Sequence, residues 1–215
     1  MDPLEIAVKV ILFFIPFLFS LCFHEFAHGF VAKLKGDKTA EQMGRLSLNP
    51  MVHVDWIGTV ALPIVAIITH LPLFGWAKPV PVNPRNLKDP KNDMFWVALA
   101  GPASNIFLFV CGLIAIFVLM KTSFVGAAHR PLAEMLMMFL YINLYLAFFN
   151  LIPLHPLDGG KILERFLPYN WNRWLEDHQY QLNMALLFLI IFGGLQFIAR
   201  PMNWIVVSSL RLMGA

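Results

Sequence analysis

Residues 10–32 read VILFFIPFLFSLCFHEFAHGFVA, an apolar run with one acidic residue, Glu25, and no basic residue. A helix rises about 1.5 Å per residue, so a run of about 20 apolar residues can cross the hydrocarbon core of a bilayer. This stretch therefore predicts a membrane-spanning helix. Its second half carries a carboxylate flanked by two imidazoles, those of His24 and His28.

The composition of the whole chain also indicates a membrane protein. Of its 215 residues, 59% are hydrophobic and 13% are charged, whereas soluble domains contain about 45–50% apolar and about 25% charged residues. The apolar runs leave no room for a separate soluble module, so we expect one membrane-embedded domain over residues 1–215. The net charge of +3 lies in short loops beside these runs, where it sets topology and does not indicate nucleic-acid binding.

Four further runs lack Asp, Glu, Lys and Arg and approach or exceed the length of a span: 56–77, 94–120, 135–157 and 180–199. The loops after the first run and after run 56–77 are rich in Lys and Arg, which places both on the cytoplasmic side by the positive-inside rule. Two loops on one side cannot flank a spanning helix, and Pro63 and Pro72 can each break one. We therefore predict that residues 56–77 enter the membrane and return as a re-entrant element.

The remaining runs then cross the bilayer at residues 10–32, 94–120, 135–150 and 182–199. The predicted fold class is an all-α polytopic membrane protein, a helical bundle of about 4–6 transmembrane segments with a re-entrant element. Residues 201–212 are too few to cross and are expected at the interface or against the bundle. The N-terminus lacks the basic region and cleavage site of a signal peptide, so we expect none to be removed.

Residues 24–28 read HEFAH, an H-E-x-x-H pattern. Positions i and i+4 of a helix share one face, so His24 and His28 can bind one zinc ion with Glu25 beside its open position. A carboxylate inside a span costs about 2.5–3.5 kcal/mol on insertion scales, so an intramembrane Glu between two His is a functional-site hypothesis by default. The alternative is a polar trio that only forms hydrogen bonds within the bundle.

Asp158 is the candidate for a third ligand, because a catalytic zinc takes three protein ligands and leaves its fourth position to water. It follows a proline-containing break after an apolar run and precedes two glycines, which allow a close approach of the backbone. The alternative role is the N-cap of a helix over residues 159–166. With run 56–77 re-entrant, an even number of crossings separates Asp158 from the histidines, so both meet toward the cytoplasmic face.

The predicted chemistry is metal-assisted hydrolysis of a peptide bond. Zinc acidifies water and polarises the scissile carbonyl, while Glu25 takes the water proton and delivers it to the leaving amine. Asn150 and Asn105 are the amides available to stabilise the developing negative charge. An interhelical hydrogen bond is the alternative for both, and it is the favoured interpretation for Asn105.

Several stretches together resemble the site-2 protease family of intramembrane zinc metalloproteases, in its short bacterial form: residues 23–28, 44–50 with 53–55 and 58, 75–84, 100–105, 150–153 and 157–160. The H-E-x-x-H pattern occurs in many metallopeptidases, but its combination with N-x-x-P and L-D-G at the end of a later run is specific to few families. The resemblance implies that His24, His28 and Asp158 bind one zinc ion per chain. It also implies that Glu25 is the base and that Asn150 contacts the transition state or substrate.

The resemblance further implies a substrate and a location. The substrate is a transmembrane helix of another protein, cleaved in or near the lipid bilayer by regulated intramembrane proteolysis. The location is a prokaryotic cytoplasmic membrane, with the active site toward the cytoplasmic side. The chain has neither the PDZ module nor the cystathionine-synthase-type module of fuller family members, so we do not expect gating by those modules.

A protease must hold its target extended, because the carbonyl groups of a helix are shielded by hydrogen bonds. An edge strand does this by β-augmentation. Two segments suit short β-strands at the cytoplasmic face: residues 44–50, where apolar and polar side chains alternate, and residues 75–83, which prolines confine to a sheet edge. The alternative is that both are interfacial loops.

The other histidines are interpreted as structural. His155 stands where the family more often has an apolar residue or proline, and we interpret it as a local hydrogen-bond partner rather than a neighbour of the metal. His53, His70, His129 and His178 have no partner at ligand spacing and are interpreted as interfacial or loop residues.

A metal-ion transporter or channel is the alternative function, since intramembrane histidines and acidic residues also line ion pathways. A transport site would not require a glutamate directly after the first histidine, nor an open position for water on the metal. The sequence therefore favours the protease.

Overall fold

The structure of the chain is a computed structural model that describes residues 3–69, 75–121, 129–192 and 194–214. Within these ranges three helices are long and apolar enough to cross a membrane: Ala7–Leu34, Pro90–Lys121 and Arg130–Asn150. They belong to α1 (Pro3–Leu34), α4 (Pro90–Lys121) and α5 (His129–Asn150). Three of the four predicted spans therefore correspond to long apolar helices.

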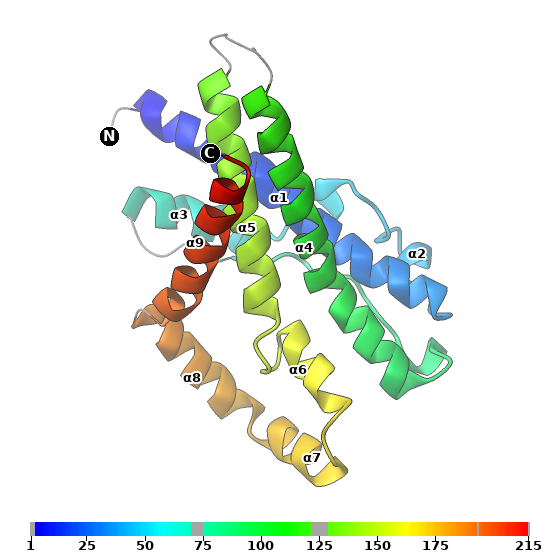
Figure 1. Cartoon of the computed structure of the whole chain (residues 1–215). Coiled ribbons are helices and arrows are strands. Elements are labelled where there is room, and N and C mark those ends of the chain that lie inside the picture. The colour runs from blue at the N-terminus through cyan, green and yellow to red at the C-terminus, as the bar shows by residue number, and fades with distance from the viewer. Residues whose placement is uncertain (1–2, 70–74, 122–128, 193, 215) are drawn as a thin grey trace.

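The remaining helices are shorter: α2 (Thr39–Gln42), α3 (Leu62–Thr69), α6 (Asp158–Glu164), α7 (Tyr169–Asp177), α8 (Gln179–Ile191) and α9 (Leu195–Leu212), with a π-helical stretch at Trp56–Ala61 and 3₁₀ turns at Pro50–Val52 and Pro84–Asn86. Figure 1 shows α4 and α5 side by side, α1 crossing them, and α9 running along α5.

Two apolar clusters hold the long helices together. In the first, α4, α5 and α9 bury Phe109, Ile116, Leu140, Leu144, Met202 and Val206. In the second, α1 and α5 bury Phe13, Phe17, Leu21, Ile142 and Leu146. Helix α5 therefore lies between α1 and α9, and α9 packs against the bundle.

The predicted fourth span at residues 182–199 is wrong. Helix α8 ends at Ile191 and α9 begins at Leu195, and neither is among the helices long and apolar enough to cross. The physical reason is the Gly193-Gly194 pair in the sequence, because glycine is a poor helix former. With 13 residues, α8 reaches about 20 Å, less than the hydrocarbon core of about 30 Å.

The predicted β-strands are also wrong, because the described residues contain none. In residues 75–83 the N–H groups of Trp76 and Lys78 donate to the single carbonyls Gly58 O and His53 O, and those of Val80 and Asn83 donate to side chains. Val80 N–H donates to Glu25 Oε2 at 2.8 Å, and Asn83 N–H donates to Asp37 Oδ2 at 2.7 Å. Pro79 and Pro81, on either side of Val80, supply no N–H at all, so a strand ladder cannot form here.

Residues 44–50, the other predicted strand, form local turns. The backbone N–H groups of Arg45 and Leu46 both donate to Ala40 O, at 2.8 Å and 3.2 Å. The Arg45 side chain reaches across to residues 75–83 and donates to the carbonyls of Lys78 and Pro79, at 2.8 Å and 3.1 Å. The two segments are therefore neighbours joined by a side chain and not by a ladder.

The two ends of run 56–77 meet. Thr59 Oγ1 donates to Trp76 O at 2.8 Å, and Trp76 N–H donates to Gly58 O at 3.2 Å. The start and the end of the run therefore lie side by side, as a re-entrant element requires. Pro63 lies in the first turn of α3, and Pro72 lies outside the described residues.

Candidate metal centre

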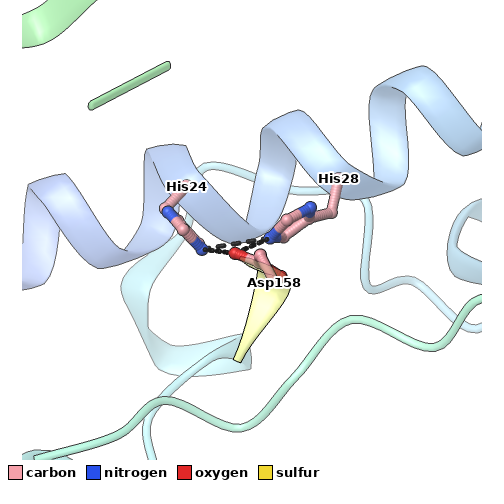
Figure 2. Close-up of side chains that lie close together, drawn as sticks. All are labelled: His24, His28 and Asp158. Atoms are coloured by element: carbon pink, nitrogen blue, oxygen red, sulfur yellow. Dashed lines mark hydrogen bonds and ion pairs between the residues drawn. The ribbon is translucent and has the colours of Figure 1, made fainter. Parts of the chain in front are cut away.

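His24 and His28 project from one face of α1, one turn apart (Figure 2). Both side chains are buried. Their Nε2 atoms lie 3.0 Å apart. Helix α1 therefore presents two imidazole nitrogens at one point, which is the geometry of an i, i+4 pair.

Asp158 joins this pair from the start of α6. Its Oδ2 atom lies 3.1 Å from His24 Nε2 and 3.3 Å from His28 Nε2. The alternative role of this residue, a helix N-cap, is not adopted, because Leu157 occupies the N-cap position and no side chain caps the helix. The carboxylate points at the two rings instead (Figure 2).

Two glycines allow the elements to come this close. A Cβ on Gly101 of α4 would lie 2.3 Å from His28 Nε2, so only glycine leaves room for the imidazoles against α4. A Cβ on Gly159 would lie 2.3 Å from Ile152 O in the turn that links α5 to α6. A side chain there would push the start of α6, and Asp158 with it, off this turn.

The second nitrogen of each ring fixes how the ring is turned. His24 Nδ1 lies 2.6 Å from Asn105 Oδ1, and His28 Nδ1 lies 2.7 Å from the main-chain oxygen of Val97. Both partners are oxygens that only accept, so each Nδ1 carries the proton and donates it. In a neutral ring each Nε2 is then the nitrogen without a proton, and it faces the centre, as a metal-binding imidazole requires.

The three ligand atoms fit a zinc ion. They lie 3.0 to 3.3 Å from one another, and Asp158 Oδ2 is buried against the two imidazole nitrogens. Acceptors this close repel one another unless a cation lies between them. Tetrahedral zinc, with bonds of about 2.0–2.1 Å, separates its ligands by about 3.3 Å. Three protein ligands from histidine and carboxylate are also the set of a catalytic zinc.

Glu25 lies beside this cluster without belonging to it. Its Oε2 atom accepts the hydrogen bond from Val80 N–H at 2.8 Å. The irregular segment 75–83 therefore orients the Glu25 carboxylate.

A cavity of about 700 Å³ reaches this site at His24 and Glu25. Its wall carries His24, Glu25 and Asn150, and most of the rest is apolar, including the rings of Phe13, Phe17, Trp76, Tyr145 and Phe149. The wall is formed by α1, α5, α9, the end of run 56–77 and the turn before α6. A polar reaction centre thus lies at the edge of an apolar space inside the helical bundle.

The two candidate amides have different positions. Asn150 lines the cavity, and its Nδ2 donates to Leu146 O one turn back in α5 at 2.9 Å. Asn105 is completely buried and is not part of the cavity wall. The structure therefore places Asn105 behind His24, as the partner of its Nδ1, and not where a substrate would lie.

Three polar residues of the bundle were missed by the sequence analysis. Ser20 and Asn143 are completely buried and belong to the hydrogen-bond network behind His24. The hydroxyl of Tyr145 is buried at the cavity and has no hydrogen-bond partner among the described residues. A signal for Asn143 was present, because an amide inside a span usually has a polar partner in another helix.

The remaining histidines lie apart from the centre. His155 Nε2 lies 2.7 Å from Glu164 Oε1, a local contact between the turn and α6. His53 lies in the loop between the 3₁₀ turn and the π-helical stretch, as a loop histidine was expected to, and it is buried and bonds to Ser47 O at 2.8 Å. His178 stacks on Trp174. His70 and the side chain of His129 lie outside the described residues.

A buried carboxylate, Asp37, joins the loop after α1 to the loop before α4. It accepts hydrogen bonds from Asn83 N–H at 2.7 Å, Asn86 Nδ2 at 2.9 Å and Thr39 N–H at 3.0 Å. Burial alone would raise the pKa of this carboxyl, but the hydrogen bonds from Thr39, Asn86 and Asn83 outweigh burial and hold its pKa below the ordinary value. The loops around residues 75–83 are therefore fixed from both sides.

Two buried histidines, a carboxylate, a neighbouring glutamate and an apolar cavity within membrane helices define the class of membrane-embedded metallopeptidases. Residues 110–193 match the profile of Peptidase family M50. This region contains Asn150 and Asp158, and the two histidines precede it.

Curated relatives match a larger part of the chain. "Putative zinc metalloprotease YwhC" of Bacillus subtilis (strain 168) is 39% identical over 157 residues, which cover 72% of this chain and 68% of the relative. The Rip2 protein of Mycolicibacterium smegmatis, with the same description, is 29% identical over 165 residues, which cover 77% of this chain and 61% of the relative. Stage IV sporulation protein FB of Bacillus subtilis (strain 168) is 32% identical over 108 residues, 48% of this chain and 32% of the relative. No solved structure matches the chain.

The chain belongs to peptidase family M50, and the resemblance to the site-2 proteases is confirmed. Membership in this family supports a membrane protease, and nothing in the comparisons supports the alternative of a metal transporter. The chain spans about two thirds of the length of YwhC and of the M. smegmatis Rip2, as the covered shares of 68% and 61% show.

Proposed function

We propose that this chain is an intramembrane zinc endopeptidase that cleaves peptide bonds in or near the transmembrane helices of other proteins. The observation that carries the proposal is the convergence of His24 Nε2, His28 Nε2 and Asp158 Oδ2 within 3.0 to 3.3 Å. His24 lines an apolar cavity whose wall also carries Glu25.

His24, His28 and Asp158 hold one zinc ion per chain in this proposal. When bound, zinc supplies a Lewis acid that polarises a peptide carbonyl and makes a water molecule easier to deprotonate. Glu25 accepts the proton of that water and passes it to the leaving amine. The hydrogen bond from Val80 N–H, at 2.8 Å, holds the carboxylate in position for both transfers.

The cavity suits an apolar segment. Aromatic and aliphatic side chains form most of its wall, so the apolar side chains of a membrane-spanning substrate can enter it without losing apolar surroundings. Asn150 is the amide on this wall, and we assign it the contact with the substrate backbone or the developing negative charge.

We place the centre toward the cytoplasmic face of a prokaryotic cytoplasmic membrane. Lys33, Lys35 and Lys38 follow the histidines at the end of α1. The positive-inside rule assigns loops of this kind to the cytoplasm.

Substitution of Glu25 tests the proposal. Glu25→Gln is expected to reduce cleavage of a membrane-spanning substrate by about 10²–10⁴-fold, with unchanged zinc content because Glu25 is not in the ligand cluster. Zinc analysis of the purified variant measures its metal content. Mass spectrometry of the single-pass proteins that co-purify with the variant identifies the substrates that it leaves uncleaved. Glu41→Gln, the same change on an exposed residue of α2, is the control and should retain cleavage. Full cleavage by Glu25→Gln, or loss of its zinc, would contradict the proposal.

A further inference from the structure

We infer that three buried side chains, Ser20, Asn105 and Asn143, fix the tautomer of His24 and thereby set the affinity of the centre for zinc. We call these three residues the polar relay. Each is completely buried, with 0% of its surface exposed. The inference rests on the zinc centre of the proposed function.

The relay starts at main-chain oxygens, which can only accept hydrogen bonds. Ser20 Oγ donates to Pro16 O at 2.7 Å, and Asn143 Nδ2 donates both to Ser20 Oγ and to Phe139 O at 2.9 Å. Because Phe139 O has no hydrogen to donate, the NH₂ end of Asn143 must face it. The oxygen of the Asn143 amide is therefore turned toward Asn105.

Asn105 is oriented in the same way. Its Nδ2 donates to Asn143 Oδ1 at 2.9 Å and lies 3.4 Å from Ser20 O, so its NH₂ end faces two acceptors. Its Oδ1 is left facing His24 Nδ1 at 2.6 Å. An amide oxygen cannot donate, so Nδ1 carries a proton, and in the neutral ring Nε2 keeps its lone pair for the metal.

This arrangement matters because His24 has an alternative. A neutral ring with its proton on Nε2 could donate to Asp158 Oδ2, 3.1 Å away, and it would have to lose that proton before binding an ion. The relay opposes this tautomer from three helices at once, because Ser20 lies on α1, Asn105 on α4 and Asn143 on α5. Packing of the three helices thus favours the His24 tautomer whose Nε2 is free to bind a metal ion.

Two substitutions at Asn105 separate orientation from packing. Asn105→Leu removes the acceptor for His24 Nδ1 and is expected to raise the zinc dissociation constant of the purified full chain about 10–100-fold. Asn105→Asp keeps an oxygen acceptor and loses the NH₂ donor, so it should bind zinc more tightly than Asn105→Leu. If Asn105 had only a structural role, Asn105→Asp would bind zinc as weakly as Asn105→Leu or more weakly. Both variants lose the hydrogen bond to Asn143 Oδ1, and the aspartate also places a carboxylate oxygen against that oxygen.

Two serines provide a matched control. Ser20→Ala and Ser104→Ala each remove a buried hydroxyl that bonds to a carbonyl of its own helix, at 2.7 Å in both cases, but only Ser20 belongs to the relay. Ser20→Ala should weaken zinc binding by a smaller factor than Asn105→Leu, because Asn143 still donates to Phe139 O. Ser104→Ala should bind zinc like the native chain.

Zinc affinity is measured by competition with a chelator, and the visible spectrum of the cobalt-loaded protein reports ligand geometry. A shifted cobalt spectrum and weaker binding in Asn105→Leu, with recovery in Asn105→Asp, support the relay. Native affinity in Asn105→Leu, or equally weak binding in both variants, overturns it. If Asn105→Leu does not fold, Asn143→Leu replaces it, and native zinc affinity in Asn143→Leu likewise overturns the relay. If the native chain binds no zinc, the proposed function is contradicted together with the relay. If the native chain and every variant bind zinc equally tightly, only the relay is contradicted.

Discussion

Gly101 is the residue that sets the distance between α4 and the metal centre. We predict that Gly101→Ala loses most of its bound zinc, because the added Cβ would lie 2.3 Å from His28 Nε2 and 2.6 Å from His24 Cε1. Elemental analysis of the purified variant measures the loss. Gly112→Ala is the control on the same helix, since the atoms nearest to its Cβ would belong to Leu140 and Phe139. That variant should be less stable but keep its zinc, and equal zinc loss in both would contradict the assignment.

Tyr145 gives a second prediction for a single residue. Its buried hydroxyl has no hydrogen-bond partner among the described residues, and an unpaired buried donor costs about 1–3 kcal/mol. Tyr145→Phe should therefore unfold at the same temperature as the native chain or at a higher one. Tyr141→Phe removes a hydroxyl that donates to Asn203 Oδ1 at 2.8 Å and should unfold at a lower temperature. The opposite order in thermal unfolding would show that Tyr145 has a structural hydrogen bond.

The metal ligands could be predicted from the sequence, but the residues that form hydrogen bonds with these ligands could not. His24 and His28 follow from i, i+4 spacing, and Asp158 follows from a break in an apolar run beside two glycines. An amide inside a span, such as Asn143, signals a polar partner in another helix, but which residue is the partner depends on how the helices pack. Ser20 carried no local pattern. Asn105 was a candidate for the reaction with an interhelical hydrogen bond as the favoured interpretation, and the structure places it behind His24, bonded to other helices.

At the scale of elements, the loop after α1 depends on Asp37. Asp37→Asn is expected to lower the unfolding temperature at pH 7, and the difference from the native chain should shrink below about pH 4. The folded chain binds this proton less readily than the unfolded chain, so the stabilisation is present above the unfolded pKa and is lost as pH falls through the lower folded pKa.

Thermal unfolding at the two pH values measures this effect. Asp177→Asn, the same change on an exposed residue at the end of α7, should have little effect at either pH. An Asp37→Asn deficit that stays constant as pH falls would show that the lost stability does not come from the ionised carboxylate.

The elements also show where a sequence pattern stops being informative. Hydropathy found α1, α4 and α5 because their apolar runs are unbroken, but it scores side chains and not backbone continuity. It therefore joined α8 and α9 across Gly193-Gly194 into one span. Residues 75–83 have the composition of an edge strand, yet Glu25 and Asp37 take the N–H groups that a ladder would use.

At the scale of the whole molecule, the return of run 56–77 lets the ends of α1 and α5 meet at the metal centre. The prediction is that α1 ends in the cytoplasm and α5 begins outside it. In a chain with Cys22 and Cys111 replaced by alanine, an impermeant thiol reagent should label Arg130→Cys in intact bacterial cells. It should label Lys38→Cys only after permeabilisation, since both positions are exposed. Labelling of Lys38→Cys in intact cells would reverse the orientation.

X-ray absorption at the zinc edge of the purified full chain tests the central claim most directly. The claim predicts one zinc ion per chain, bound by two imidazole nitrogens with oxygen atoms completing the shell, and a signal that is lost in His28→Ala. A shell that contains sulfur, or an unchanged spectrum in His28→Ala, would contradict a centre built from His24, His28 and Asp158.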